Sequence, residues 1–152
     1  MCYARDHEVL TAIGGEILAS RYYVKELNFA YVQIVKNQLR VYVPAEKWND
    51  PPRLVSEMRI TSLPGNGEVQ VCHDVNVWPP FNGKGLGNHF LQRRDSAYTK
   101  LGIGMVLVTA RTDNPIEIHL LEKNFYVRAT TFKSLWDTPC ILYYKKFGKV
   151  QR

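Results

Sequence analysis

The chain has 152 residues, of which 45% are hydrophobic and 22% are charged. These values predict one globular domain over residues 1–152 with an ordinary core, and they exclude an intrinsically disordered chain. The formal net charge is +6, and it is uneven, since residues 1–76 carry −1 and residues 77–152 carry +7. The C-terminal half therefore suits an anionic partner, either a phosphorylated ligand or a nucleic acid, although a solvated basic surface would carry the same charge.

The sequence indicates neither a membrane segment nor a metal site. Its longest strongly apolar run, 102–110, is far too short to cross a bilayer, and its first residues hold no apolar core of a signal peptide. We therefore expect a cytoplasmic protein without membrane contacts. The three cysteines, Cys2, Cys72 and Cys140, lie far apart and outside any CxxC or CxxH pattern. We expect no metal, and we interpret Cys72 and Cys140 as reduced thiols buried on strands.

The first half is predicted to begin with a helix over residues 6–20. Apolar residues recur along one face of this segment, and Asp6 can cap its N-terminus. Three strands rich in Val, Ile and Tyr are predicted next, over 29–35, 38–43 and 54–62. Proline and glycine clusters separate these strands from one another and from the second half.

The second half opens with residues 68–78, whose alternating apolar and polar side chains predict one continuous strand that ends at Pro79-Pro80. A helix is then predicted over 86–100, and its apolar face contains one polar intruder, Arg94. A strand, a helix and two strands are predicted to follow, over 105–110, 114–123, 126–133 and 140–146. The elements together predict an α+β fold with a central, mixed, mostly antiparallel twisted sheet flanked by about four helices.

A glycine-rich turn joins the long predicted strand to the helix at 86–100. It reads Asn82-Gly83-Lys84-Gly85-Leu86-Gly87. Glycine lets the backbone approach a ligand closely and adopt a positive φ, and the helix N-terminus adds unpaired N–H groups and the positive end of a dipole. The combination predicts a phosphate or pyrophosphate site, unless the turn is an ordinary strand–helix corner. The GxGxG spacing is neither the dinucleotide-binding GxGxxG nor a P-loop.

This segment resembles the GNAT (N-acetyltransferase) superfamily. In that family a strand ending in Val-x-Pro is followed by Arg/Gln-x-x-Gly-x-Gly/Ala. Here Val77-Trp78-Pro79 matches the strand end, Gly85 and Gly87 match the two small positions, and Asn82 stands where Arg or Gln is usual.

A second block, about 25 residues further on, supports the same resemblance. The family pattern Asn-x-x-Ala-x-x-Leu-Tyr-Glu-Lys-x-Gly-Phe is similar to residues 114–126, which keep the Asn, Leu, Glu and Lys and have a tyrosine in place of the final phenylalanine. Glu117, Leu121 and Phe125 depart from the pattern. The resemblance covers residues 77–126, and residues 1–60 match only in their order of elements.

The resemblance implies that acetyl-CoA is the co-substrate and that an amine attacks it directly in a ternary complex. In this family the pyrophosphate lies on the N–H groups of the glycine turn, and the acyl thioester lies along the preceding strand, where backbone N–H groups stabilise the oxyanion. The positions implied in CoA binding are Val75, Val77, Asn82, Gly83, Lys84, Gly85, Leu86, Gly87, Asn88, Asn114 and Lys123. The acceptor stays open between a small molecule and a protein amine, with a nucleic-acid amino group less favoured. A homodimer is compatible with the family.

An amine must lose a proton before it attacks, so a general base is expected. The candidates on or beside the predicted strand are His73, Asp74 and Glu68. The ordinary pKa of a histidine suits a base near neutral pH, but a packed histidine bonded to backbone would give the same sequence.

The general acid is missing from the expected place. The family's tyrosine, which protonates the departing thiolate, corresponds to Leu121, and a leucine cannot donate a proton. Water, or one of Tyr126, Tyr143 and Tyr144, would have to replace it.

Three interpretations follow from these observations. The first is an active CoA-dependent acyltransferase, whose acceptor side would include the aromatic residues near Tyr22, Tyr23 and Trp48. Tyr22 and Tyr23 could equally be core residues, which is the more common place for such side chains. The second is a GNAT-shaped binding protein without turnover, which the leucine at position 121 favours. The third is a basic nucleic-acid-binding protein, which the Lys-rich C-terminal tail favours, although the sequence holds no recognised nucleic-acid motif.

Overall fold

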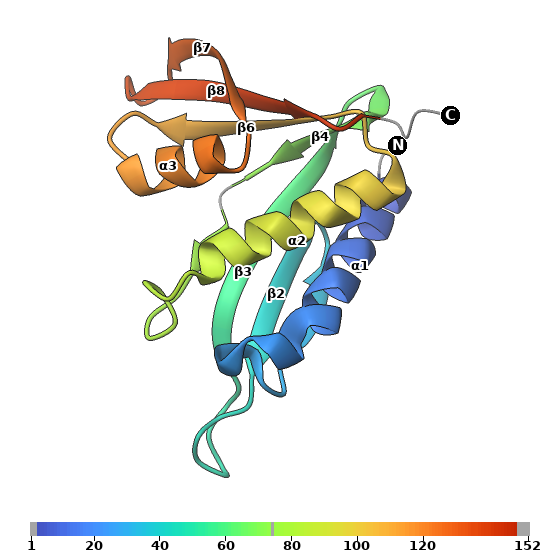
Figure 1. Cartoon of the computed structure of the whole chain (residues 1–152), viewed down its shortest axis with the longest axis vertical. Coiled ribbons are helices and arrows are strands. Elements are labelled where there is room, and N and C mark those ends of the chain that lie inside the picture. Colours follow the sequence, from blue (N-terminus) through green and yellow to red (C-terminus); the bar gives the residue numbers. More distant parts are fainter. Residues whose placement is uncertain (1–2, 74, 149–152) are drawn as a thin grey trace.

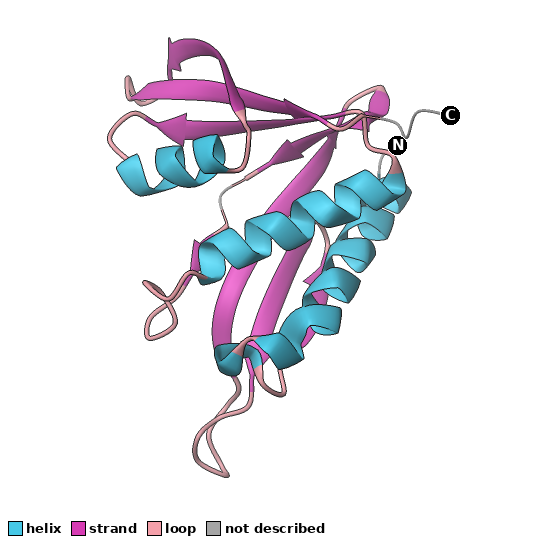
Figure 2. Ribbon diagram, viewed as in Figure 1, coloured by secondary structure: helices cyan, strands magenta, loops and turns pink. Residues whose placement is uncertain are grey.

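The computed structural model describes residues 3–73 and 75–148, which form one mixed eight-stranded sheet with helices packed beside it (Figures 1 and 2). The helices are α1 (Tyr3–Ser20), α2 (Leu86–Leu101) and α3 (Pro115–Lys123), with single 3-10 turns at η1 (Arg21–Tyr23) and η2 (Lys25–Leu27). The strands are β1 (Tyr31–Val35), β2 (Gln38–Val43), β3 (Arg53–Leu63), β4 (Asn66–Cys72), β5 (Asn76–Val77), β6 (Met105–Arg111), β7 (Val127–Lys133) and β8 (Pro139–Lys146).

The sheet confirms the predicted α+β class. Its strands lie in the order β1-β2-β3-β4-β6-β8-β7, and β5 pairs with β3 beside this path. β4 and β6 are parallel, whereas the other pairs are antiparallel. The parallel pair needs a long crossover, which α2 supplies. The about four predicted helices correspond to three α-helices and two short 3-10 turns in the described residues.

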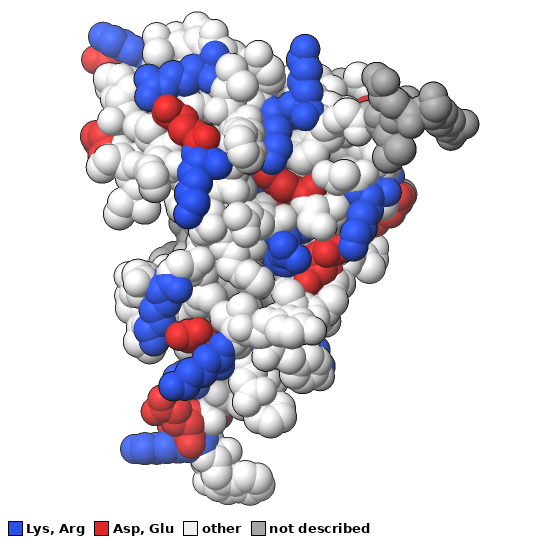
Figure 3. Space-filling view, in the orientation of Figure 1, with Lys and Arg blue, Asp and Glu red and all other residues white. Residues whose placement is uncertain are grey.

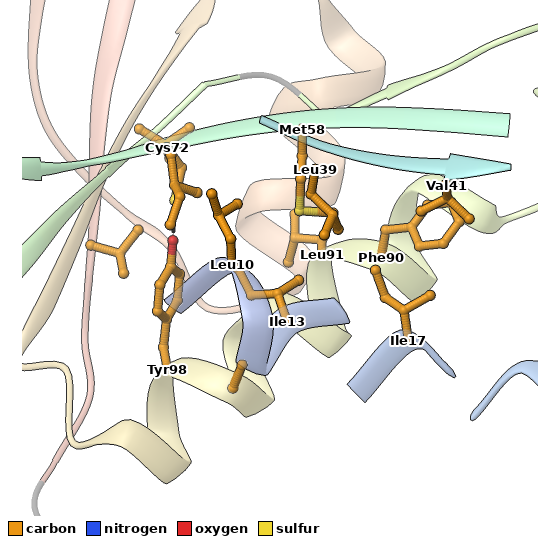
Figure 4. Close-up of a cluster of buried hydrophobic side chains, with 14 of the residues drawn as sticks. Leu10, Ile13, Ile17, Leu39, Val41, Met58, Cys72, Phe90, Leu91 and Tyr98 are labelled. Carbon is orange, nitrogen blue, oxygen red and sulfur yellow. Dashed lines mark hydrogen bonds between the residues drawn. The ribbon is translucent and has the colours of Figure 1, made fainter. Parts of the chain in front are cut away.

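The main core lies between the two long helices and the strands β1 to β4. α1 and α2 pack against each other and against this part of the sheet. Figure 4 shows apolar side chains from α1, from β2 and β3, and from α2 meeting in one cluster; among them are Leu10, Ile13, Ile17, Leu39, Val41, Met58, Phe90 and Leu91. Burial of these side chains holds both helices against the sheet.

The two cysteines in the described residues match their prediction. Cys72 and Cys140 are buried free thiols on strands. The Sγ atom of Cys72 lies 2.9 Å from the hydroxyl of Tyr98, within the same core (Figure 4). In the described part of the chain, no helix combines the length and the apolar character that crossing a membrane would need.

The predicted capping role of Asp6 is wrong. α1 begins three residues earlier, at Tyr3, so Asp6 lies within its first turn. The Asp6 carboxylate is buried and accepts hydrogen bonds from the backbone N–H (2.9 Å) and the hydroxyl (2.7 Å) of Ser62 on β3. The residue therefore ties the helix to the sheet instead of closing the helix end.

The prediction of one strand over residues 68–78 is also wrong. β4 ends at Cys72, and β5 covers only Asn76 and Val77. The pairing partner changes within this segment, because β4 pairs with β3 and β6 whereas β5 pairs only with β3 among the described strands. This change of partner shapes the candidate site.

Candidate active site

The sheet opens where β4 and β6 separate. Their parallel pairing runs from Val69 and Met105 to Cys72 and Val108, and β6 then continues to Arg111. On the other side, β5 stays on β3 through hydrogen bonds from the Ser56 hydroxyl to the Asn76 carbonyl (2.8 Å) and from the Trp78 N–H to the Val55 carbonyl (2.9 Å). A gap thus forms between β5 and β6.

The glycine turn stands at one end of this gap. Gly83 and Gly85 have φ angles of 75° and 80°, in the left-handed region that favours glycine. Gly85 is the N-cap of α2, and the first helical bond runs from the His89 N–H to the Gly85 carbonyl (3.2 Å). The N–H groups before His89 therefore lack intrahelical partners, which is the geometry that binds an anion at a helix start.

A cavity of about 210 Å³ fills the gap and reaches the first turn of α2. Its walls come from the β4–β5 segment, from one face of α2, from β6 and from α3. The lining residues are His73, Val75, Asn76, Gly87, Leu91, Arg94, Val108, Asn114, Ile116, Glu117, Leu120 and Leu121. Most of these side chains are apolar, and a few polar groups converge among them, as in many ligand sites.

The structure brings several of the predicted CoA-binding positions together. Val75, Gly87 and Asn114 line the cavity, and Val77 lies beside Gly87, since a Cβ added to Gly87 would be 3.9 Å from Val77 Cγ2. Asn114 also caps α3 by accepting a hydrogen bond from the Glu117 N–H (3.2 Å). The predicted start of that helix is therefore confirmed.

The remaining predicted positions lie around the turn and at the end of α3. Asn82, Gly83, Lys84 and Gly85 are exposed, and Leu86 is buried. The Asn88 side chain accepts a hydrogen bond from Asn124 Nδ2 (2.8 Å) and so joins the start of α2 to the end of α3. Lys123 is exposed next to that contact. Lys84 is near the start of α2 because it immediately precedes the N-cap Gly85 in sequence. Lys123 is near it because its neighbour Asn124 bonds to Asn88.

The three base candidates have different surroundings. His73 lines the cavity and also two adjoining hollows, one of them formed with Gln38, Glu57 and Arg59. Glu68 lies near the opposite end of β4, where it pairs with Arg5 (3.4 Å), and it does not line the cavity. Asp74 lies outside the described residues. Among the described candidates, only His73 is in the cavity.

The tyrosines named as replacements for the missing acid do not line the cavity, whereas Leu121 is buried in its wall. The Tyr126 hydroxyl donates to Asp95 (2.7 Å), and burial raises its pKa well above the ordinary value. The Tyr143 hydroxyl donates to Glu122 (2.7 Å), and burial followed by this hydrogen bond raises its pKa. Both hydroxyls therefore already have partners and hold their protons.

Two charged residues that line the cavity, Arg94 and Glu117, were not among the predicted site residues. Arg94 is 2% exposed, and its guanidinium donates to the Tyr126 hydroxyl (3.1 Å). Burial acts to lower the pKa of Arg94, but the neighbouring Cys72, Tyr126 and Asp95 outweigh burial, so the pKa lies well above its ordinary value. The guanidinium is therefore charged. Glu117 is half-buried in the α3 wall and accepts a hydrogen bond from Asn114 Nδ2 (3.2 Å). In the sequence, Arg94 stood out as a polar residue on an apolar helix face, and Glu117 stood out as a departure from the family pattern.

The other histidines of α2 and α3 do not line the cavity. His89 Nε2 lies 3.1 Å from the Ser20 hydroxyl, and burial followed by the charge of Arg93 lowers the pKa of His89. His119 is exposed on α3. In residues 3–73 and 75–148, no group of three or more His, Cys, Asp or Glu side chains is placed to hold a metal ion.

Comparisons with known proteins identify the fold. No protein-family model matches the sequence, and no curated protein is significantly similar to it in sequence. In structure, the chain is similar to the ribosomal-protein-S18-alanine N-acetyltransferase from Escherichia coli, with a TM-score of 0.59, 13% identity, and coverage of 89% of this chain and 90% of that one. It is also similar to a chain of the NatC complex bound to Gag peptide and CoA, with a TM-score of 0.62, 10% identity, and coverage of 95% and 91%.

A third similar structure is an acetyltransferase of the GNAT family from Streptococcus pneumoniae, with a TM-score of 0.58, 18% identity, and coverage of 74% of this chain and 68% of that one. At these identities the likeness concerns the fold, which spans most of the chain. Together with the split between β4 and β6 and the glycine turn at the start of α2, it shows that the chain has the fold of the GNAT acetyltransferases.

Proposed function

We propose that the protein is an acetyl-CoA-dependent N-acyltransferase whose CoA site is the cavity between β5 and β6. The observation that carries this proposal is the double position of Gly87, which belongs to the first turn of α2 and also lines the cavity. A ligand could therefore bind with an anionic group on the helix N-terminus and with an attached arm inside the cavity. CoA has this form, with a pyrophosphate attached to a long arm that ends in a thiol.

The residues present fit that ligand. The turn offers N–H groups before His89, and Lys84 and Lys123 add positive charge near the start of α2. Apolar side chains of Val75, Leu91 and Val108 suit the aliphatic part of the arm. Bound there, CoA would supply an activated acyl group, and the protein would supply position and proton transfer.

His73 is the proposed general base. It is the base candidate that lines the cavity, and it also borders the open hollow of Gln38, Glu57 and Arg59. An amine entering through that hollow would meet the imidazole before it met the acyl group. His73 would accept the proton that the amine must lose, a role for which an imidazole is suited near neutral pH.

The acceptor is proposed only as a primary amine. Exposed aromatic side chains lie near the end of α1 and on the loop after β2, with Tyr22 70%, Tyr23 88% and Trp48 94% exposed. Large exposed aromatic residues are common where a protein binds a partner. We therefore propose that these aromatic side chains contact a part of the acceptor that lies outside the hollow beside His73.

Calorimetric titration with acetyl-CoA tests the proposed site. The wild type should bind, and Gly87→Glu should lose at least about tenfold in affinity, because a carboxylate would face the pyrophosphate. Gly87→Ala is the matched control, since its Cβ would meet only ordinary contacts, at 3.7 Å from Leu120 and 3.9 Å from Val77. Absence of binding by the wild type, or equal binding by Gly87→Glu, would contradict the proposal.

A CoA-binding protein without turnover is the second candidate, because Leu121 occupies the acid position in the cavity wall. This candidate predicts the same titration but no acyl transfer. The nucleic-acid interpretation has less support, since on the face shown in Figure 3 the Lys and Arg side chains are interspersed with Asp and Glu.

A further inference from the structure

The inference concerns Arg94, a buried cation in the cavity wall. Its position on α2 is two turns after Gly87, which places it about 10 Å further along the helix at 1.5 Å per residue. Both residues line the same cavity. If the pyrophosphate binds at the helix start, Arg94 therefore faces the inner part of the site.

The charge of Arg94 is only partly balanced. Asp95 is the buried carboxylate beside it, but its Oδ1 accepts a hydrogen bond from Tyr126 (2.7 Å) and its Oδ2 pairs with Lys145 (3.1 Å). Arg94 Nε lies 3.6 Å from Oδ1, too far for a hydrogen bond, and this buried nitrogen has no hydrogen-bond partner in the described residues. Two cations thus share one carboxylate.

A buried cation of this kind is costly unless an anion compensates it. Tyr126 connects Arg94 to the place where the family's acid is missing, because its hydroxyl accepts from Arg94 and its backbone N–H donates to the Leu121 carbonyl (3.0 Å). Arg94 and Leu121 both line the cavity. The cation therefore lines the same cavity as the position from which a tyrosine would protonate the leaving thiolate.

We propose that Arg94 stabilises the departing CoA sulfur as a thiolate and so replaces the missing acid. The inference rests on the proposed function. In the transfer, the amine nitrogen forms a bond to the acyl carbon and the carbon–sulfur bond breaks with its electron pair left on sulfur. The amine proton passes to His73, and no proton has to reach the sulfur while the guanidinium faces it. Charge stabilisation in a buried site replaces proton donation.

The charge of Arg94 also bears on a thiol of the protein itself, that of Cys72. Burial raises the pKa of Cys72, and the charge of Arg94 is the largest effect that opposes this rise. The other titratable or charged groups around the inner cavity and Arg94 are His73, Asp95, Tyr98, Glu117, Tyr126 and Lys145. An experiment that varies the pH must therefore separate the protonation changes of these groups from that of the CoA thiol.

A comparison of two ligands does so. CoA and S-methyl-CoA should be titrated calorimetrically into the protein between about pH 6.5 and about pH 9.5, a range that brackets an ordinary thiol pKa of about 8.5. Changes in the protein's own groups affect both ligands alike, and only CoA can become a thiolate. If the site lowers the thiol pKa, CoA gains affinity over S-methyl-CoA as the pH rises. A lowering by one unit gives about a tenfold change in the affinity ratio.

The wild type should show that increase of about tenfold, and Arg94→Met should keep the ratio constant within about twofold. Arg94→Lys retains a cation and should preserve part of the increase. Arg93→Met is the matched control, because Arg93 is the neighbouring arginine of α2 and does not line the cavity. It should behave as the wild type.

A constant ratio in the wild type, or an undiminished increase in Arg94→Met, would overturn the role of Arg94 while leaving the CoA site intact. If neither ligand binds the wild type, the proposed function fails, and this inference fails with it. Because the wild-type ratio alone can overturn the role, the test does not depend on the folding of Arg94→Met.

Discussion

Tyr126 donates a hydrogen bond of 2.7 Å from its hydroxyl to Oδ1 of Asp95, and both side chains are buried. Removing the hydroxyl in Tyr126→Phe would leave a buried carboxylate with fewer donors. We expect a loss of about 1–3 kcal/mol in the free energy of unfolding, measured by urea denaturation. A variant as stable as the wild type would contradict this role.

Asp6 gives a second stability prediction. Its carboxylate accepts two hydrogen bonds from Ser62, including one from a buried backbone N–H. Asp6→Ala should destabilise the fold by about 1–3 kcal/mol, because that N–H loses its partner. Asp6→Asn keeps an acceptor oxygen and should lose clearly less. Equal urea midpoints for the two variants would show that the bonds to Ser62 do not matter.

The α2 glycines separate backbone strain from ligand binding. Gly85 and Gly102 have positive φ angles, 80° and 72°, at the two ends of the helix, and an added Cβ would meet no atom within 4 Å at either site. Alanine at either position should therefore cost about 1–2 kcal/mol through the left-handed conformation. Only Gly85→Ala should also weaken acetyl-CoA binding, because only Gly85 lies at the proposed pyrophosphate site. Equal losses of affinity in both variants would point to a general effect of strain.

His89 predicts a pH dependence of stability. Burial lowers its pKa in the folded state, so the unfolded chain binds a proton more readily as the pH falls below the ordinary value of 6.5. This contribution therefore destabilises the fold from about pH 6.5 downward and is absent at higher pH. His89→Gln should lose less stability than the wild type between about pH 7.5 and about pH 5. His119→Gln, at an exposed position on α3, should follow the wild type.

The sequence predicted the local elements well, since the apolar periodicities and the glycine turn depend on neighbouring residues. It could not predict the break between β4 and β5, because alternation does not report which strand supplies the hydrogen bonds. In β4 it did not identify the buried face either, since Gln70 and Cys72 are buried and the valines at 69 and 71 are half-buried. Asp6 was misinterpreted for a similar reason: its partner, Ser62, is distant in sequence. The cytoplasmic location and the homodimer stay predictions.

The site was predicted in part. The turn pattern indicated the start of α2 and the residues beside it, and His73 does line the cavity. Arg94 was visible as a polar residue on an apolar helix face, but its partners Tyr126 and Asp95 come together only in the fold. Glu68 was a candidate because the sequence predicted one strand for Glu68 and His73, yet Glu68 lies near the start of β4 and His73 follows its end.

The most direct test of the account is the release of free thiol from acetyl-CoA in the presence of primary amines, including peptides with a free N-terminus and polyamines. We predict amine-dependent thiol release by the wild type and a fall of about 10²-fold or more in His73→Gln, the usual contribution of a general base. His119→Gln should keep the wild-type rate, because His119 does not line the cavity. Saturating binding of acetyl-CoA without thiol release for any amine would contradict the account, and the protein would then be a CoA-binding protein without turnover.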